Sequence, residues 1–109
     1  MSVTYERVAR ADELADGSQR PVTVAGRRLV LCRSEGQVFA FENRCTHDSE
    51  ALLGGTLRKC TIVCPIHGAR FSLKTGMPFG PPAFEPLLTF AVRETDEGDL
   101  EVATVPNVD

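Results

Sequence analysis

The sequence predicts an all-β protein in which an antiparallel β scaffold, a sandwich or a small barrel, carries a loop-rich insert. Short runs rich in Val, Leu, Phe and Thr recur along the chain, and no helical periodicity is sustained. Glycine and proline are concentrated in residues 43–86, between two regions of strand-like sequence. We therefore expect the strands to form a scaffold that presents the intervening segment as functional loops.

The first four strands are expected before that segment. Residues 3–8 and 21–24 are short β-type runs, and residues 10–16 offer at most one short turn. Residues 28–33 (RLVLCR) and 38–42 (VFAFE) flank Ser-Glu-Gly-Gln, a glycine-containing turn that is typical of a β-hairpin.

A second hairpin is expected near the C-terminus. Residues 87–94 and 100–105 flank Asp-Glu-Gly-Asp, and Leu88, Phe90 and Val92 alternate with polar or small residues. Because side chains alternate between the two faces of a strand, this pattern indicates a strand with one buried face.

The length of 109 residues predicts one domain. Its scaffold would comprise residues 1–42 and 87–109, and its insert would comprise residues 43–86. Two short apolar pieces, at residues 61–63 and 69–73, interrupt the insert.

Composition and charge narrow the possible functions. The formal net charge is −3 and no basic stripe is present, so we do not expect nucleic-acid binding. We expect a cytoplasmic protein without a membrane contact, because the chain shows neither a signal peptide nor an apolar run of membrane-spanning length. In a reducing compartment, cysteines are expected as metal ligands or thiols, with Cys32 in the core and Cys60 free. The acidic run ETDEGDLE indicates a solvated hairpin or a surface that steers a partner.

Two short clusters in the insert each combine one Cys with one His. They are Cys45-Thr-His47 and Cys64-Pro-Ile-His67, and they contain both histidines of the chain. Two loops of this kind can supply four ligands to one metal centre, so the nature of that centre is the main question that the sequence raises.

Three interpretations of the clusters are open. Two Cys and two His make a tetrahedral zinc set, although zinc fingers usually take both Cys from one loop and both His from the other. Core cysteines and surface histidines without a common role would leave the repeated spacing unexplained. A two-iron cluster bound by two Cys on one iron and two His on the other would need one ligand of each kind from each loop, which this spacing supplies.

The run CTH…CPIHGARFSLKTG…PPAFEPLLTFAV, within residues 43–92, resembles the Rieske ferredoxins of bacterial aromatic-ring-hydroxylating dioxygenase systems. The resemblance implies the Rieske fold and one [2Fe-2S] cluster, with Cys45 and Cys64 as thiolate ligands and His47 and His67 as imidazole ligands. Other positions that commonly carry the same residue in that family are Leu52, Gly55, Pro65, Gly68, Phe71, Thr75, Gly76, Pro82, Ala83, Pro86 and Leu87.

The resemblance also implies a function. It predicts a soluble, monomeric one-electron carrier between an NAD(P)H-dependent flavin reductase and a terminal dioxygenase, with both partners docking at the tip formed by His47 and His67. No histidine remains for the mononuclear iron of an oxygenase and no G-x-G-x-x-G segment is present, so we expect a component that is not itself an enzyme. Alternatives are a Rieske-like small subunit of another redox enzyme, such as a nitrite or arsenite oxidoreductase, and a zinc-binding interaction module.

Residues beside the predicted ligands indicate a low reduction potential. Respiratory-chain Rieske proteins have a disulfide and two hydroxyl donors near the cluster, and the matching positions here are Glu50, Ile66, Ala69 and Phe71. Fewer hydrogen-bond donors stabilise the negative charge of the reduced cluster less. We therefore expect a reduction potential of roughly −150 mV. The chain also has Asp48 in a stretch where the family often has Gly, and its carboxylate is expected to favour the oxidised cluster further.

Overall fold

The computed structural model describes residues 3–107, and within them it contains ten β-strands, one 3-10 turn and no α-helix. The predicted all-β class is therefore confirmed. The elements, in chain order, are β1 (Tyr5–Arg10), η1 (Ala11–Glu13), β2 (Gln19–Val24), β3 (Arg27–Ser34), β4 (Gln37–Glu42), β5 (Thr56–Arg58), β6 (Thr61–Val63), β7 (Arg70–Ser72), β8 (Thr89–Phe90), β9 (Val92–Glu94) and β10 (Asp99–Ala103). None of the described residues belongs to a helix that is long and apolar enough to cross a membrane.

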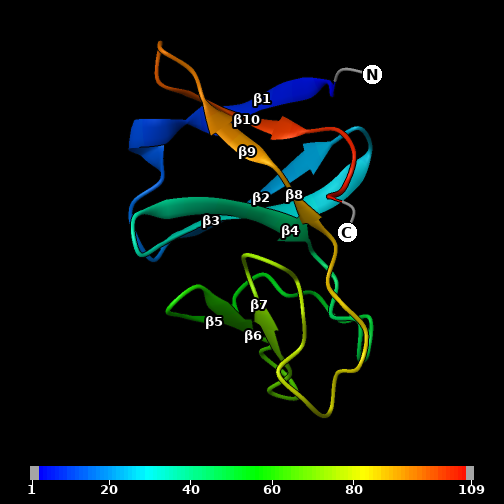
Figure 1. The fold of residues 1–109 in the computed structure, drawn as a ribbon. Helices are drawn as coiled ribbons and strands as arrows, with labels where there is room; N and C mark the ends of the chain where they lie inside the picture. Colours follow the sequence, from blue (N-terminus) through cyan, green and yellow to red (C-terminus); the bar gives the residue numbers. More distant parts are fainter. Residues whose placement is uncertain (1–2, 108–109) are drawn as a thin grey trace.

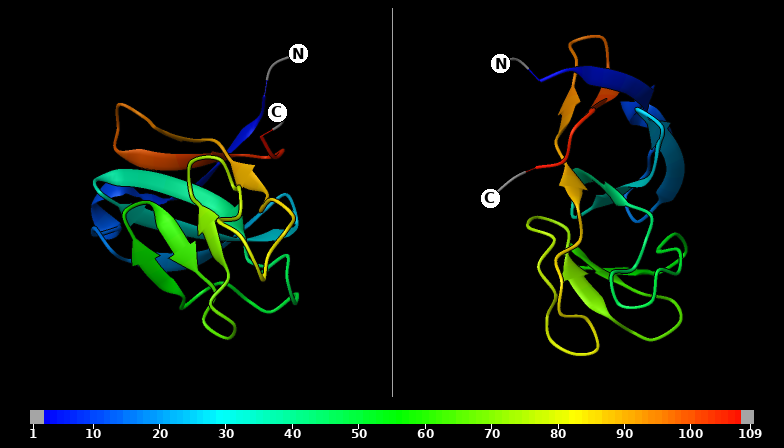
Figure 2. Two further views of the ribbon diagram at one scale, coloured as in Figure 1. Left: turned by 60° about the horizontal axis from the view of Figure 1, so that its bottom comes forward. Right: turned by 90° about the vertical axis from the view of Figure 1, so that its right-hand side faces the viewer.

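The strands form three antiparallel sheets (Figure 1). Their orders are β1-β10-β9, β2-β3-β4-β8 and β5-β6-β7. The first two sheets curve around a shared interior, and the third sheet lies at one end of the molecule among long loops (Figure 2). Both Cys–His clusters belong to the loops around this third sheet, at the opposite end from the β9–β10 turn (Figure 1).

Two apolar cores hold this arrangement together. The scaffold core contains buried residues of the first two sheets, among them Val24, Leu31, Phe90, Leu100 and Val102. The site core joins β3 and β4 to the third sheet and its loops, and its members are Val30, Cys32, Phe41, Cys45, Leu52, Ile62, Cys64, Ala69, Phe71, Leu73, Ala83 and Leu87. The scaffold core contains no residue of the insert, whereas β3 and β4 contribute side chains to both cores.

The C-terminal strand differs from the expectation. Residues 87–94 form two strands, because β8 pairs with β4 in the second sheet whereas β9 pairs with β10 in the first. Ala91 lies between them, and its carbonyl accepts the Ala103 amide at 2.9 Å. Burial also shifts by one residue at the start of this segment: Leu87 is 3% exposed and Leu88 is 39% exposed. The prediction that Leu88 lies on the buried face was therefore wrong.

The third sheet was not predicted as a sheet. Its strands have three residues each, and only β6 and β7 coincide with apolar pieces of the insert. The two-residue turn between β5 and β6, Lys59-Cys60, has φ values of 46° and 62°. This left-handed conformation usually attracts Asn and Gly, so the sequence gives no turn signal there. The other predicted strands are confirmed, with ends that differ by up to a few residues.

Candidate metal centre

The first Cys–His loop follows β4 and is closed by hydrogen bonds. The side-chain oxygen of Asn43 accepts the amides of Leu52 and Leu53 at 2.8 and 2.9 Å. Within the loop, the Cys45 amide donates to the Glu50 carbonyl at 2.7 Å. Hydrogen bonds within the loop therefore fix the backbone of Cys45 without any contribution from a bound metal centre.

The second Cys–His loop is the turn between β6 and β7. The Cys64 amide donates to the Ala69 carbonyl at 2.7 Å, and the Gly68 amide donates to the Cys64 carbonyl at 3.1 Å. Gly68 has a φ of 74°, a conformation that glycine adopts without the steric cost of a Cβ atom. This tight turn places Cys64 and His67 on a well-defined backbone.

The two loops bring all four predicted side chains together in two layers. Cys45 and Cys64 are 0% and 2% exposed and belong to the site core. The side chains of His47 and His67 are 31% and 50% exposed, and their rings meet edge to face with centroids 5.2 Å apart. The thiols therefore face the interior and the imidazoles form the boundary with solvent.

Burial dominates the electrostatics of the inner layer. It raises the pKa of the Cys45 thiol to about 11, against the opposing effect of the His47 backbone amide, and the neighbouring Cys64 thiol raises this pKa further. An uncompensated thiolate is unfavourable in such a place, whereas a bound metal cation would stabilise it. Two adjacent buried thiols under two adjacent imidazoles fit the donor set of a Rieske-type [2Fe-2S] cluster.

Asp48 is a fifth polar side chain at this site. The sequence predicted that its carboxylate would influence the cluster, but it did not predict a contact with His67. One of its carboxylate oxygens contacts Nδ1 of His67 and lies 3.6 Å from Nδ1 of His47. The other oxygen accepts the Glu50 amide at 3.0 Å. The Glu50 amide and, next, the contact with His67 lower the pKa of Asp48. Asp48 is therefore a held, ionised carboxylate between the two imidazoles.

The loop that contains Pro82, Phe84 and Glu85 lies across a groove from His47. The Thr46 hydroxyl donates to the Glu85 carbonyl at 2.9 Å, which ties this loop to the first Cys–His loop. A groove of about 400 Å³ between them is lined by Thr46, His47, Pro82, Phe84 and Glu85. Phe84 is 80% exposed, so a large apolar surface lies beside the imidazole edge.

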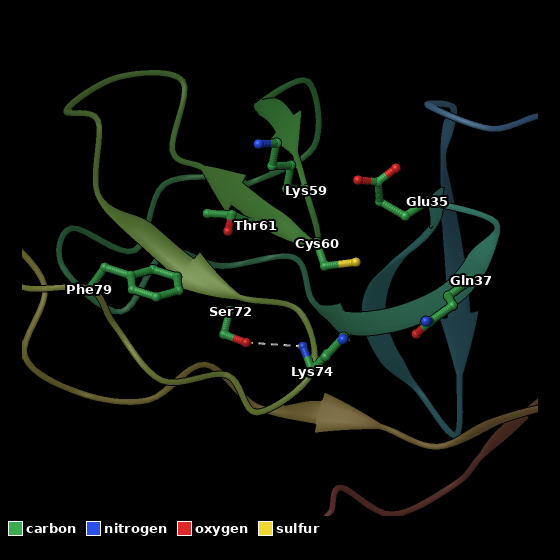
Figure 3. A pocket seen from close by; sticks show the side chains of 8 residues that line it. All are labelled: Glu35, Gln37, Lys59, Cys60, Thr61, Ser72, Lys74 and Phe79. Carbon is green, nitrogen blue, oxygen red and sulfur yellow. Dashed lines mark hydrogen bonds between the residues drawn. The ribbon is translucent and has the colours of Figure 1, made fainter.

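The other two cysteines lie apart from these four groups. Cys32 is fully buried in β3, and burial raises its pKa to about 12. Cys60 is half-buried, and its amide donates to the Ser34 hydroxyl at 3.2 Å. It borders a separate groove of about 390 Å³ between the β3–β4 turn and the third sheet (Figure 3). All four cysteines are free of disulfides.

Comparison with known proteins gives consistent matches along the chain. The Rieske [2Fe-2S] domain family matches residues 4–102. Ferredoxin CarAc of Metapseudomonas resinovorans is 38% identical over 104 residues, which cover 94% of this chain and 96% of that protein. The ferredoxin component of the naphthalene 1,2-dioxygenase system of Pseudomonas putida is 32% identical over 93 residues, covering 85% of this chain and 89% of the relative.

Solved structures agree with the sequence matches. A chain in the complex of reduced oxygenase and oxidized ferredoxin of carbazole 1,9a-dioxygenase superimposes with a TM-score of 0.88 at 34% identity, covering 96% of this chain and 97% of its own length. The ferredoxin of carbazole 1,9a-dioxygenase from Nocardioides aromaticivorans IC177 gives a TM-score of 0.85 at 30% identity, with coverages of 92% and 97%. The chain thus belongs to the Rieske [2Fe-2S] family and, within it, to the ferredoxins that carry electrons in aromatic ring-hydroxylating dioxygenase systems.

Proposed function

We propose that Cys45 and Cys64 bind one iron of the cluster, that His47 and His67 bind the other, and that electrons pass through the exposed imidazole edge. The observation that carries this proposal is the layered burial of the four side chains, 0% and 2% for the cysteines against 31% and 50% for the histidine side chains. A [2Fe-2S] cluster held in this way supplies one-electron redox chemistry.

The chain's own residues orient the ligands and exclude water. The closed loops fix the backbones of Cys45 and Cys64, and the apolar members of the site core surround both thiols. Phe71, which is fully buried in β7, has no hydroxyl to donate toward the site. This scarcity of donors supports the expectation of a low reduction potential, roughly −150 mV. A measured potential well above zero would contradict it.

The proposed partners are a flavin-dependent reductase and a terminal oxygenase, both docking at the His47–His67 tip. Exposed apolar residues surround the tip: Phe84 is 80% exposed and Ile66 is 56% exposed. Aromatic and aliphatic side chains in such a position are typical anchors of protein interfaces. The 34% identical chain in the complex of reduced oxygenase and oxidized ferredoxin of carbazole 1,9a-dioxygenase supports an oxygenase as one partner.

We further propose that residues 43–86 act as the cluster-binding subdomain and residues 1–42 and 87–109 as its scaffold, in a monomeric cytoplasmic protein. The composition of the scaffold core, whose members all lie in residues 1–42 and 87–109, supports this division. The first two and last two residues of the scaffold lie outside the described residues.

The ligand assignment can be tested by spectroscopy of the purified protein. The wild type should be red-brown and give a Rieske-type EPR signal after reduction, whereas Cys45→Ser and His67→Ala should lose that signal. Cys60→Ser is the matched control, because this thiol lies outside the proposed ligand set. A wild-type protein that is colourless and carries stoichiometric zinc even when it is produced in iron-replete medium would overturn the assignment.

The docking surface can be tested separately by electron transfer. Phe84→Ala should slow electron delivery to a terminal oxygenase of the carbazole or naphthalene dioxygenase type without changing the EPR signal. Phe79→Ala is the control, because Phe79 is also an exposed phenylalanine, 55% against 80%, but lines the other groove. Equal rates for the two variants would refute docking at Phe84.

A further inference from the structure

The carboxylate of Asp48 is held at the ligand site by contacts to both of its oxygens. Its side chain is only 14% exposed. The Glu50 amide fixes one oxygen, and Nδ1 of His67 contacts the other. The Asp48 side chain therefore points toward the two imidazoles and has little freedom to turn toward solvent.

Asp48 also completes a set of metal-ligating atoms. The Sγ atom of Cys45, a ring nitrogen of His47 and a carboxylate oxygen of Asp48 all lie within 4.8 Å of one another. These atoms are thus close enough to be drawn onto a single ion by small side-chain movements. The three residues fall within one tight loop, so the backbone already brings them together.

The chemistry of the three donors suits a divalent transition metal. Thiolate, imidazole and carboxylate together are ligands for zinc and its neighbours, and three protein ligands leave one position for water. The contact from His67 would orient the ligating carboxylate, as partners of metal ligands commonly do. Binding would replace the thiol S–H bond of Cys45 with an S–metal bond and release the proton to solvent.

We propose that the cluster-free protein binds one divalent transition-metal ion through Cys45, His47 and Asp48. This inference rests on the proposed function, because Cys45 and His47 are also proposed cluster ligands. Since the two states share these residues, a single ion and the cluster exclude each other. Asp48 is the only one of the three that belongs to the single-ion state alone, which makes it the residue to test.

Cobalt(II) alone is the probe for this site. The full-length cluster-free chain should bind one equivalent and show a thiolate-to-cobalt charge-transfer band in the near ultraviolet. Asp48→Asn should weaken binding by about tenfold or more, because removal of a mere outer-shell partner of a metal ligand already costs about that much. Glu50→Gln is the matched control, because only its backbone amide, which the substitution keeps, contacts Asp48. Equal affinity for Asp48→Asn and wild type would overturn the proposal.

Two further measurements separate this inference from the proposed function. Cys64→Ser should lose the Rieske EPR signal but keep cobalt binding, because Cys64 is not one of the three ligands. Asp48→Asn should keep the EPR signal of the loaded protein. Cobalt binding that depends on Cys64 and not on Asp48 would contradict the three-ligand site, even where the cluster assignment holds.

Folding of the variants can be followed in the same samples. Full-length protein produced in iron-limited, zinc-supplemented medium should carry one zinc ion in native mass spectra, with the narrow charge distribution of a folded chain. Asp48→Asn should show the same charge distribution with less zinc. A folded wild type without bound zinc or cobalt would also overturn the proposal.

Discussion

Individual cysteines in this protein have very different surroundings. Cys32, Cys45 and Cys64 are buried in the site core, whereas Cys60 is half-buried at the rim of a groove. Burial disfavours the thiolate, which is the reactive form of cysteine. Position in the fold therefore decides which thiol can react with reagents in solution.

Iodoacetamide should accordingly modify the cluster-loaded protein at Cys60 alone. Cys32, whose pKa is raised to about 12 and whose side chain is fully buried, should stay unmodified at neutral pH. Peptide mass spectrometry would locate the label, and Cys60→Ser should abolish it while Cys32→Ser should not. Labelling of Cys32 in the folded protein would contradict this account.

Glu13 provides a pH-dependent contribution to stability at the residue scale. Its carboxylate accepts the Arg10 amide at 2.8 Å, and this hydrogen bond lowers the pKa of Glu13. A lowered pKa in the folded state contributes stability above the ordinary glutamate value of about 4.3, and the contribution is lost as the pH falls through the folded pKa. Glu13→Gln should therefore be less stable than wild type at pH 7, and the difference should shrink at about pH 2.

Urea unfolding at the two pH values would measure this difference. Asp12→Asn is a suitable control, because the side chain of Asp12 is 78% exposed and its ion pair with Arg10 spans 3.7 Å. Such surface pairs contribute little to stability. A Glu13→Gln effect that grows on acidification would contradict the assigned direction of the pKa shift.

Secondary structure elements depend on a few backbone positions that allow only glycine. Gly76 lies in the loop after β7 and has a φ of 80°. A Cβ atom there would collide with the carbonyl oxygen of Leu87, whose amide donates to the Gly76 carbonyl at 2.7 Å. The close approach joins the insert to the segment that enters β8.

Gly76→Ala should therefore destabilise the protein more than Gly36→Ala. Both glycines have positive φ, 80° and 76°, but a Cβ atom at Gly36 meets nothing within 4 Å. We expect a cost of about 1–2 kcal/mol for Gly36→Ala from the left-handed conformation alone. Gly76→Ala should cost about 3 kcal/mol or more, because the Leu87 backbone must also move. Chemical unfolding would compare the two, and equal costs would contradict the steric argument.

Patterns in the sequence predict the scaffold strands better than the insert. Hydrophobic runs with glycine-containing turns mark β3 and β4, and the four Cys and His positions are brought together as their spacing suggests. The three-residue strand β5 and the Lys59-Cys60 turn have no such signal. The position of Asp48 between the imidazoles depends on the folded loop, so the sequence alone could not reveal it.

Across the whole molecule, the β9–β10 turn, which belongs to the acidic run ETDEGDLE, and the candidate metal centre lie at opposite ends (Figure 1). Part of the acidic C-terminal hairpin is paired within the scaffold: Asp99 bonds Arg7 at 2.9 Å, and Glu101 bonds Arg93 at 2.7 Å. These contacts favour a solvated, locally balanced hairpin over a surface that contacts partners beside the imidazoles.

Because the protein has two apolar cores, we expect the insert and the scaffold to respond differently to loss of the cluster. Hydrogen exchange should show lost protection for residues 43–86 after the cluster is removed, because Cys45 and Cys64 are members of the site core. Amides in β1 and β10 should keep most of their protection, because the scaffold core contains no residue of the insert. Uniform loss of protection along the chain would show that the scaffold does not hold its fold independently.

The half-exposed imidazoles above two buried thiols leave the proposed centre one opening to the outside. A donor and an acceptor that both need this opening must take turns, so the protein has to release one before it can meet the other. Slow dissociation from either partner would slow electron transfer from the reductase to the oxygenase. Excess reductase should then compete with the oxygenase for the shared docking surface and slow electron delivery. Short-lived complexes should therefore suit this protein better than tight ones.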